Sequence, residues 1–118
     1  TVTERRRVPA HEHGRVVRRA LDAVERGLAD PALNVTTLAE RVGVHRSLLT
    51  ERFSRELGVA PKDYITSLRL RRAVELLQRG DEPVAAVAAA CGYENPAYFS
   101  RLVRRETGMS PTEIRNSF

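Results

Sequence analysis

Arginine is the residue type whose chemistry is most evident in this sequence. The 118 residues include 20 Lys and Arg against 15 Asp and Glu, and Lys62 is the only lysine. A guanidinium group carries a rigid fork of donors that matches phosphate oxygens or the edge of a guanine, whereas an ammonium group is a point charge. The composition therefore favours an anionic partner, although a bias of arginine over lysine also arises in GC-rich genomes.

A segment framed by two glycines shows how such arginines could be presented to a partner. Residues 92–108 read GYENPAYFSRLVRRETG, in which Asn95-Pro96 is the start signal of a helix. Phe99 and Val103 are four residues apart and therefore define the face that packs on a core. The surface left for a partner carries Ala97, Tyr98, Arg101 and Arg104.

A solvated basic face is the alternative interpretation of each arginine taken singly. It applies to Arg46, Arg52, Arg55, Arg104 and Arg105, but their clustering on two equivalent helices argues against it. Arg55 and Arg105 each precede a glutamate near a helix end, where a structural role competes with a phosphate contact. We therefore leave these two out of the set expected to read bases.

The spacing of apolar residues predicts an all-α fold of about seven helices. No segment shows a convincing period of two, so we expect no strand. Asn34 and Asn95 are expected N-caps, and Gly43 and Gly58 are expected helix stops. The expected helices cover residues 15–29, 35–42, 46–57, 61–78, 84–90, 96–106 and 111–115.

The sequence contains an internal repeat. A shift of about 49 residues aligns the first part of each copy: Val35 with Val84, Ala39 with Ala88, and Gly43 with Gly92. A shift of one residue more aligns the second part: Arg55-Glu56 with Arg105-Glu106, Gly58 with Gly108, and Pro61 with Pro111. Each copy reads as a short helix, a glycine turn and a second helix, which is the pattern of a helix-turn-helix. We therefore expect a flexible tail over residues 1–13, helix-turn-helix subdomains over 14–60 and 80–118, and a connecting helix over 61–79.

These residues resemble the DNA-binding domain of AraC/XylS-type bacterial transcription regulators. The resemblance covers about residues 16–115 and rests on Leu38-Ala39 with Gly43, Leu49 with Phe53, GVAP at 58–61, the run 70–77, and GYENPAYFSRLVRRETGMSP at 92–111. It implies two helix-turn-helix subdomains, bridged by one long helix, that bind two successive major grooves of double-stranded DNA at an asymmetric site. Such regulators usually carry a separate effector or dimerisation domain, and the threonine at position 1 fits a domain detached from a longer protein.

The resemblance also implies which residues contact DNA. The first reading helix matches the family at Arg46, Ser47, Thr50 and Glu51, and Arg52 shares its basic surface. The second reading helix matches it at Pro96, Ala97, Tyr98 and Arg101, and Arg104 shares its surface. Glu51 either accepts a hydrogen bond from a cytosine or orients Arg46 or Arg55, and we favour the orienting role.

The sequence departs from the family pattern at the start of both reading helices. His45 stands where the family usually has a capping serine, and it is a poorer cap. Pro96 and Ala97 stand where side chains that form hydrogen bonds are common. The second reading helix is therefore expected to rely on Arg101, on contact with thymine methyl groups and on DNA shape.

The expected function is sequence-specific DNA binding by a bacterial transcription regulator. An activator is the expected type of regulator, and the cytoplasm is the expected location. RNA polymerase is a further candidate partner, the isolated domain is expected to be a monomer, and the full-length protein could dimerise through a missing domain. The alternative is a helical protein-interaction module whose exposed arginines bind an acidic protein surface. A nonspecific nucleoid protein is a third possibility.

Other kinds of site have little support in the sequence. No nucleophile and base pair, phosphate-binding loop or acid pair is apparent, so we expect neither an enzyme nor a cofactor. His11, His13 and His45 lack the spacing of metal ligands, and Cys91, with no basic neighbour in view, is expected to be a buried thiol. Arg5-Arg6-Arg7 fits either an arm that reaches phosphates or a minor groove or a disordered interdomain linker, and we favour the linker. No apolar run approaches the roughly 20 residues that span a bilayer, so no membrane contact is expected.

Overall fold

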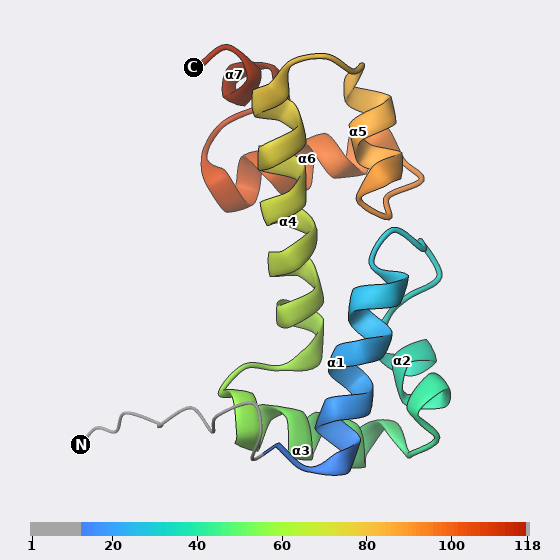
Figure 1. The fold of residues 1–118 in the computed structure, drawn as a ribbon. Helices are drawn as coiled ribbons and strands as arrows, with labels where there is room; N and C mark the ends of the chain where they lie inside the picture. The colour runs from blue at the N-terminus through green and yellow to red at the C-terminus, as the bar shows by residue number, and fades with distance from the viewer. Residues whose placement is uncertain (1–12, 118) are drawn as a thin grey trace, which may run out of the picture. The chain divides into compact units, whose positions relative to one another are not determined.

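The computed structural model describes residues 13–117, which form seven α-helices and no strand (Figure 1). The helices are α1 (Arg15–Gly27), α2 (Val35–Val42), α3 (Arg46–Leu57), α4 (Pro61–Arg79), α5 (Val84–Ala90), α6 (Pro96–Thr107) and α7 (Pro111–Arg115). The expected all-α fold is confirmed. The largest difference is at the end of α1, which stops at Gly27 rather than at residue 29. The expected tail with Arg5-Arg6-Arg7 lies outside the described residues.

The chain packs into two compact units. The first unit contains the residues up to Gly27 together with Leu33–Ile65, and the second contains Leu28–Ala32 together with Thr66–Phe118. Helix α4 therefore contributes to both units. The loop after α1 belongs to the second unit, although the helices on either side of that loop belong to the first.

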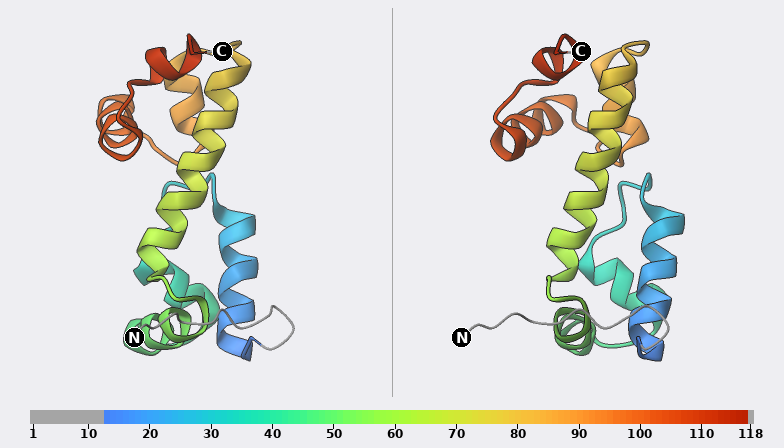
Figure 2. Two further views of the ribbon diagram at one scale, coloured as in Figure 1. Left: turned by 90° about the vertical axis from the view of Figure 1, so that its left-hand side faces the viewer. Right: turned by 60° about the vertical axis from the view of Figure 1, so that its left-hand side comes forward.

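The first unit is built around a small apolar core. Helices α1, α2 and α3 lie beside one another in both views of Figure 2. Their buried residues are Val17, Ala20 and Val24 from α1, Leu38, Ala39 and Val42 from α2, and Leu49 and Phe53 from α3. The ring of Tyr64 packs edge-on against Phe53, with ring centroids 5.3 Å apart. Because Leu49 and Phe53 are both fully buried, the core face predicted for α3 is confirmed.

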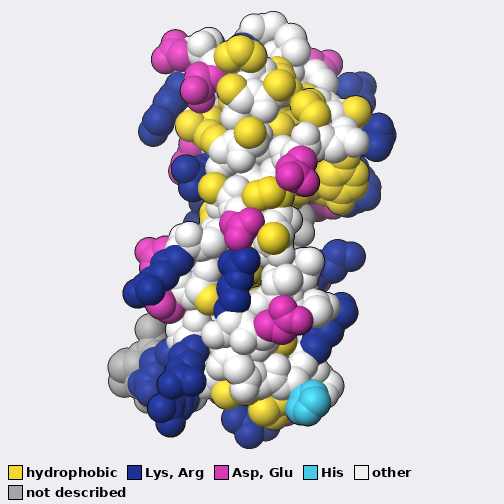
Figure 3. All heavy atoms as spheres, turned by 90° about the vertical axis from the view of Figure 1, so that its right-hand side faces the viewer, with side chains coloured by type: hydrophobic (Ala, Val, Ile, Leu, Met, Phe, Trp, Pro, Cys, Tyr) yellow, Lys and Arg dark blue, Asp and Glu magenta, His cyan; other side chains and the backbone are white. Residues whose placement is uncertain are grey.

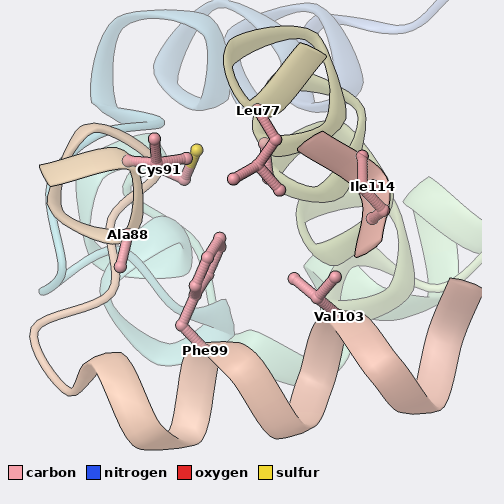
Figure 4. Close-up of a cluster of buried hydrophobic side chains, with 8 residues drawn as sticks. Leu77, Ala88, Cys91, Phe99, Val103 and Ile114 are labelled. Carbon is pink, nitrogen blue, oxygen red and sulfur yellow. The ribbon is translucent and has the colours of Figure 1, made fainter. Parts of the chain in front are cut away.

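The second unit has a core of its own. Its buried members are Ala73, Leu77, Val87, Ala88, Cys91, Phe99, Val103 and Ile114. Figure 4 shows Phe99 and Val103 projecting from α6 toward the residues that the other helices of this unit supply. Both side chains are fully buried, so the core face predicted for α6 is also confirmed.

Polar caps and glycines bound the helices where the sequence predicts. The side chain of Asn34 accepts the N–H of Thr37, and the hydroxyl of Thr37 accepts the N–H of Asn34, each at 2.9 Å. The side chain of Asn95 accepts two N–H groups from the first turn of α6, at 2.9 and 3.1 Å. The side chain of His45 makes no capping hydrogen bond at the start of α3, as its residue type predicts.

Cys91 is the one cysteine of the chain, and it is fully buried in the second core, as expected. Burial raises the pKa of the thiol from its ordinary value of 9.0 to about 11, and the charges of Arg72 and Arg69 oppose this shift in part. The expectation that Cys91 has no basic neighbour is therefore wrong, because α4 brings both arginines close from a distant part of the sequence. A thiol with a raised pKa stays protonated at neutral pH and is a poor nucleophile.

Helix α5 has an outer surface of alanine. Ala85, Ala86 and Ala89 are exposed, and the upper part of the face drawn in Figure 3 is dominated by hydrophobic side chains. Basic and acidic side chains are both present over the lower part of the same face. The first helix of the second helix-turn-helix therefore offers packing surface but few groups that could bind an anion.

Replacing Asn34 with alanine is expected to lower the free energy of unfolding by about 1 kcal/mol, because the N–H of Thr37 loses its acceptor. His45→Ala is the matched control, since His45 occupies the N-cap of α3 without capping it, and its effect should stay within about 0.5 kcal/mol. Denaturant titration followed by circular dichroism measures both. Equal losses for the two variants would contradict the cap assigned to Asn34.

Candidate nucleic-acid interface

Helix α3 buries one face and exposes the other. Leu49 and Phe53 are fully buried, and at about 100° per residue the opposite side of the helix carries three exposed residues: Ser47, Glu51 and Arg55. Thr50 and Arg52 lie at the border between these faces and are half-buried. Ser47 and Glu51 therefore share the exposed side of α3, with Thr50 and Arg52 at its edges. Arg46, in contrast, lies in the first turn at an angle close to the buried face.

Glu51 is engaged with two arginines of its own helix. Its Oε2 lies 3.0 Å from Nη1 of Arg55, and its Oε1 lies 3.6 Å from Nε of Arg52. The three side chains are 42% to 62% exposed, so the ion pairs add little to stability. The ion pairs change the local charge instead, because the carboxylate of Glu51 offsets part of the positive charge on this side of α3.

Arg46 is held by a different helix. Its Nη1 donates to the hydroxyl of Thr36, at 3.0 Å, in the first turn of α2. Glu51 therefore orients Arg55 and Arg52 in this structure, whereas Arg46 is oriented by Thr36.

Helix α6 starts rigidly and exposes a row of residues. Asn95 caps it, Pro96 occupies its first position, and Phe99, Leu102 and Val103 turn into the core. Its exposed residues include the predicted Ala97, Tyr98, Arg101 and Arg104. All of the residues predicted for the second site therefore lie on the surface of one helix.

The exposed residues of α6 differ in how they are held. Tyr98 is 45% exposed, and its ring centroid lies 6.0 Å from that of Tyr93 in the preceding turn. Nη1 of Arg104 lies 3.8 Å from Oε1 of Glu113 in α7. Arg101 makes no hydrogen bond or ion pair with residues 13–117, so its guanidinium is available to a partner.

Glu113 is fixed by the cap of α7. Its Oε1 accepts the N–H of Ser110 at 2.8 Å, and the hydroxyl of Ser110 accepts the N–H of Glu113 at 3.1 Å. The hydrogen bond from the Ser110 backbone, and to a lesser degree the charge of Arg104, lowers the pKa of the Glu113 carboxyl. The carboxylate near Arg104 is therefore ionised down to a lower pH than an unpartnered glutamate.

The two helices carry different charges at equivalent positions. A shift of 50 residues aligns Ser47 with Ala97, Glu51 with Arg101, and Ser54 with Arg104. At the last two of these positions α6 is thus cationic where α3 is acidic or neutral, whereas Arg55 and Arg105 give both helices the same charge at the next position. The surface of α6 suits phosphate or guanine, while that of α3 offers hydroxyl groups and a partly neutralised cluster.

The structure draws attention to two residues that were not singled out from the sequence. Leu48 is 36% exposed at the position of α3 that aligns with Tyr98, and the 50-residue shift could have found it. Arg69 is only 7% exposed, and it falls on the buried stripe of α4 at the four-residue spacing of Ile65, Ala73 and Leu77. Its position could have been noticed in the sequence, because a charged residue interrupts a run of apolar residues at four-residue spacing.

Residues 13–117 contain no group of three or more metal-ligating side chains close enough to hold a metal ion. The same part of the chain has no helix with both the length and the apolar composition that crossing a membrane requires.

Comparison with known proteins relates this fold to regulators. A family model described as "Helix-turn-helix domain" matches residues 38–117. The transcriptional regulator CdhR of Pseudomonas aeruginosa is 40% identical over 86 residues, which are 73% of this chain and 26% of that protein. The transcriptional activator RhaS of Escherichia fergusonii is 36% identical over 84 residues, which are 71% of this chain and 30% of that protein. The chain thus spans about a quarter to a third of the length of these relatives.

Solved structures agree with the sequence matches. The C-terminal domain of AraT, a response regulator from Geobacillus stearothermophilus, matches with a TM-score of 0.86 and 27% identity, over 91% of this chain and 88% of that one. The DNA-binding domain of AdpA, solved in complex with a target DNA, matches with a TM-score of 0.74 and 31% identity, over 85% and 88% of the two chains. The repeated helix-turn-helix, the family model and these relatives together show that the chain belongs to the AraC-type family of helix-turn-helix domains of transcription regulators.

Proposed function

We propose that this chain is the DNA-reading domain of a bacterial transcription regulator and that it binds double-stranded DNA in a sequence-specific manner. The observation that carries the proposal is that α3 and α6, the second helices of the two repeats, each bury one face and leave the opposite face open. On α6 that open face carries Arg101 and Arg104. The complex of AdpA, a relative of similar fold, with a target DNA supports the same conclusion.

In the second subdomain, Arg101 is the principal base-reading residue. Its guanidinium has no partner among residues 13–117, and the N6–N7 edge of adenine suits it less well than the two acceptors of guanine. Ala97 and the exposed ring of Tyr98 supply apolar contact for thymine methyl groups. Arg104 contacts a phosphate, because Glu113 already lies beside it and only a strong anion competes for it.

In the first subdomain, short polar side chains read bases and arginines bind the backbone. Ser47 and Thr50 reach base edges only if α3 lies deep in the groove. Arg46, steadied by Thr36, reaches a phosphate or a base edge, and Arg52 reaches a phosphate. Glu51 shapes the arginine cluster rather than contacting a base.

The two subdomains, residues 14–60 and 80–118, act together through the connecting helix. Helix α4 has 19 residues, which at 1.5 Å per residue gives a rod about 28 Å long. One polypeptide with two non-identical reading helices therefore recognises an asymmetric site over two successive major grooves, about 10 base pairs apart. It needs no second copy to do so, and we propose that the isolated domain binds as a monomer.

Effector binding, dimerisation and contact with RNA polymerase are functions of the full-length regulator. An effector or dimerisation domain, contact with RNA polymerase and activation of transcription in the cytoplasm are proposed by analogy with relatives such as RhaS, which is named an activator. No catalytic step is assigned to this chain.

Selection of bound sequences from a random duplex pool tests the proposed function. The expected result is an asymmetric consensus with two blocks about one helical turn apart, and affinity that falls as salt rises. Equal binding of scrambled duplexes with no salt dependence would favour a protein-interaction module. Salt dependence without any sequence preference would indicate a nonspecific nucleoid protein.

Replacing Arg101 with alanine is expected to cost about 1–3 kcal/mol on the selected site and to relax selectivity at one guanine. Binding to scrambled DNA should change little. Titrations on both duplexes at several salt concentrations measure this, with Arg26→Ala as a control, because Arg26 is paired with Asp22 on α1 at 3.2 Å. A similar loss on every duplex, with the salt slope reduced by about one unit, would reassign Arg101 to a phosphate.

Replacing Glu51 with glutamine is expected to raise affinity for selected and scrambled duplexes alike, because Arg52 and Arg55 lose the carboxylate that offsets their charge. The salt slope should steepen by up to about one unit, while the base preference stays the same. Glu25→Gln on α1 makes the same change in net charge at an exposed position and serves as the control. A preference altered at only one or two base pairs would show that Glu51 contacts a base.

A further inference from the structure

Arg69 is a charged residue in a position that otherwise suits an apolar one. It is 7% exposed and lies on the α4 stripe formed by Ile65, Ala73 and Leu77, which are 3%, 0% and 0% exposed. Burying a guanidinium is unfavourable unless hydrogen bonds replace its water. The contacts that replace the water therefore indicate what Arg69 does.

Arg69 binds the loop that follows α1. Its Nε donates to the carbonyl oxygen of Leu28 at 3.0 Å, and its Nη2 donates to the carbonyl oxygen of Asp30 at 2.8 Å. Both acceptors belong to the second unit, as does Arg69 itself. The planar fork of the guanidinium thus fixes two backbone groups at once.

The glycine turn between α5 and α6 lies directly against these groups. A Cβ on Gly92 would stand 2.7 Å from the carbonyl oxygen of Leu28 and 2.9 Å from Nε and Nη2 of Arg69. Gly43, the equivalent glycine of the first repeat, has nearly the same φ, 87° against 86°, but a Cβ there would meet nothing within 4 Å. The turn before α6 is therefore fitted to Arg69, whereas the turn before α3 has open space.

Tyr93 connects Arg69 to the start of α6. The guanidinium carbon of Arg69 lies 5.5 Å from the centroid of the Tyr93 ring, a cation–π contact. The same ring has centroid distances of 5.7 Å to Phe99 and 6.0 Å to Tyr98, both in the first turn of α6. A continuous set of contacts thus runs from the loop after α1, through Arg69 and Tyr93, to the reading helix.

We propose that Arg69 is a positioning residue for DNA reading: it sets the direction of α6 and thereby places Arg101 and Tyr98 on their bases. The inference rests on the proposed function. Arg69 does not touch DNA, because it is buried and its donors are directed at Leu28 and Asp30. The turn of the first repeat makes no comparable contact, since a Cβ on Gly43 would meet nothing within 4 Å.

Arg69→Met is the main test, because methionine keeps much of the length and all of the burial but removes the donors. The selected base profile should lose its preference at the guanine read by Arg101 by about tenfold or more, the scale of a good base contact. Preferences in the block read by α3, and affinity for scrambled DNA, should stay within about twofold of wild type. Arg69→Lys can donate to one of the two carbonyls and should restore part of the preference.

The two turn glycines provide a matched pair of variants. Gly92→Ala and Gly43→Ala both place alanine at a positive φ, but only Gly92→Ala displaces Arg69 and the carbonyl of Leu28. Gly92→Ala should reproduce the profile of Arg69→Met, and Gly43→Ala should leave the block read by α6 unchanged. If Arg69→Met does not fold, Tyr93→Leu decides, because it removes the cation–π contact while keeping an apolar side chain against Phe99.

Two results would overturn the inference. One is a folded Arg69→Met protein with the wild-type base profile, and the other is an equal loss over both blocks, which would mean that Arg69 contributes only stability. A wild-type protein that selects no sequence would instead refute the proposed function, so the two failures are distinguishable.

Discussion

Each reading helix packs one face on a small apolar core, and only the opposite face is available to a partner. Leu49 with Phe53, and Phe99 with Val103, are the pairs that meet this constraint, and all four side chains are fully buried. The asparagine caps and the glycines at the helix ends fix where the helices that carry these pairs begin and end. Because these few residues hold each helix, the residues on its opposite face are not needed for the core.

Features that depend on neighbours in the sequence could be predicted, and features that depend on distant contacts could not. The Asn34 and Asn95 caps, the Gly43 stop and the buried i, i+4 pairs are local, and the sequence alone placed them correctly. The basic groups near Cys91 and the acceptors of Arg69 come from segments tens of residues away, so no local pattern indicated them. For the candidate site, the shared faces of α3 and α6 were predictable, whereas the partners of Glu51, Arg46 and Arg104 required coordinates.

The two copies of the repeat have kept their scaffold and diverged in charge. Glu51 and Arg101 occupy the same place on equivalent helices, yet one is paired with neighbouring arginines and the other makes no polar contact with residues 13–117. A surface with balanced charge binds less tightly to any phosphate backbone, and a cationic surface binds more tightly. Because of this divergence, the surface of α6 attracts a phosphate backbone more strongly than the surface of α3 does.

The contacts of residues 28–32 affect the order in which the two units can fold during synthesis. This loop leaves the ribosome before α4, but Arg69, which donates to its carbonyls, and Gly92, which lies against it, are synthesised later. The helices of the first unit can therefore pack their core during synthesis. The loop acquires its hydrogen bonds from Arg69 only after α4 has been made. A fragment that began at Pro61 would keep Arg69 but lose the carbonyls of Leu28 and Asp30 that accept its hydrogen bonds, so the second unit depends on a segment that precedes the first repeat.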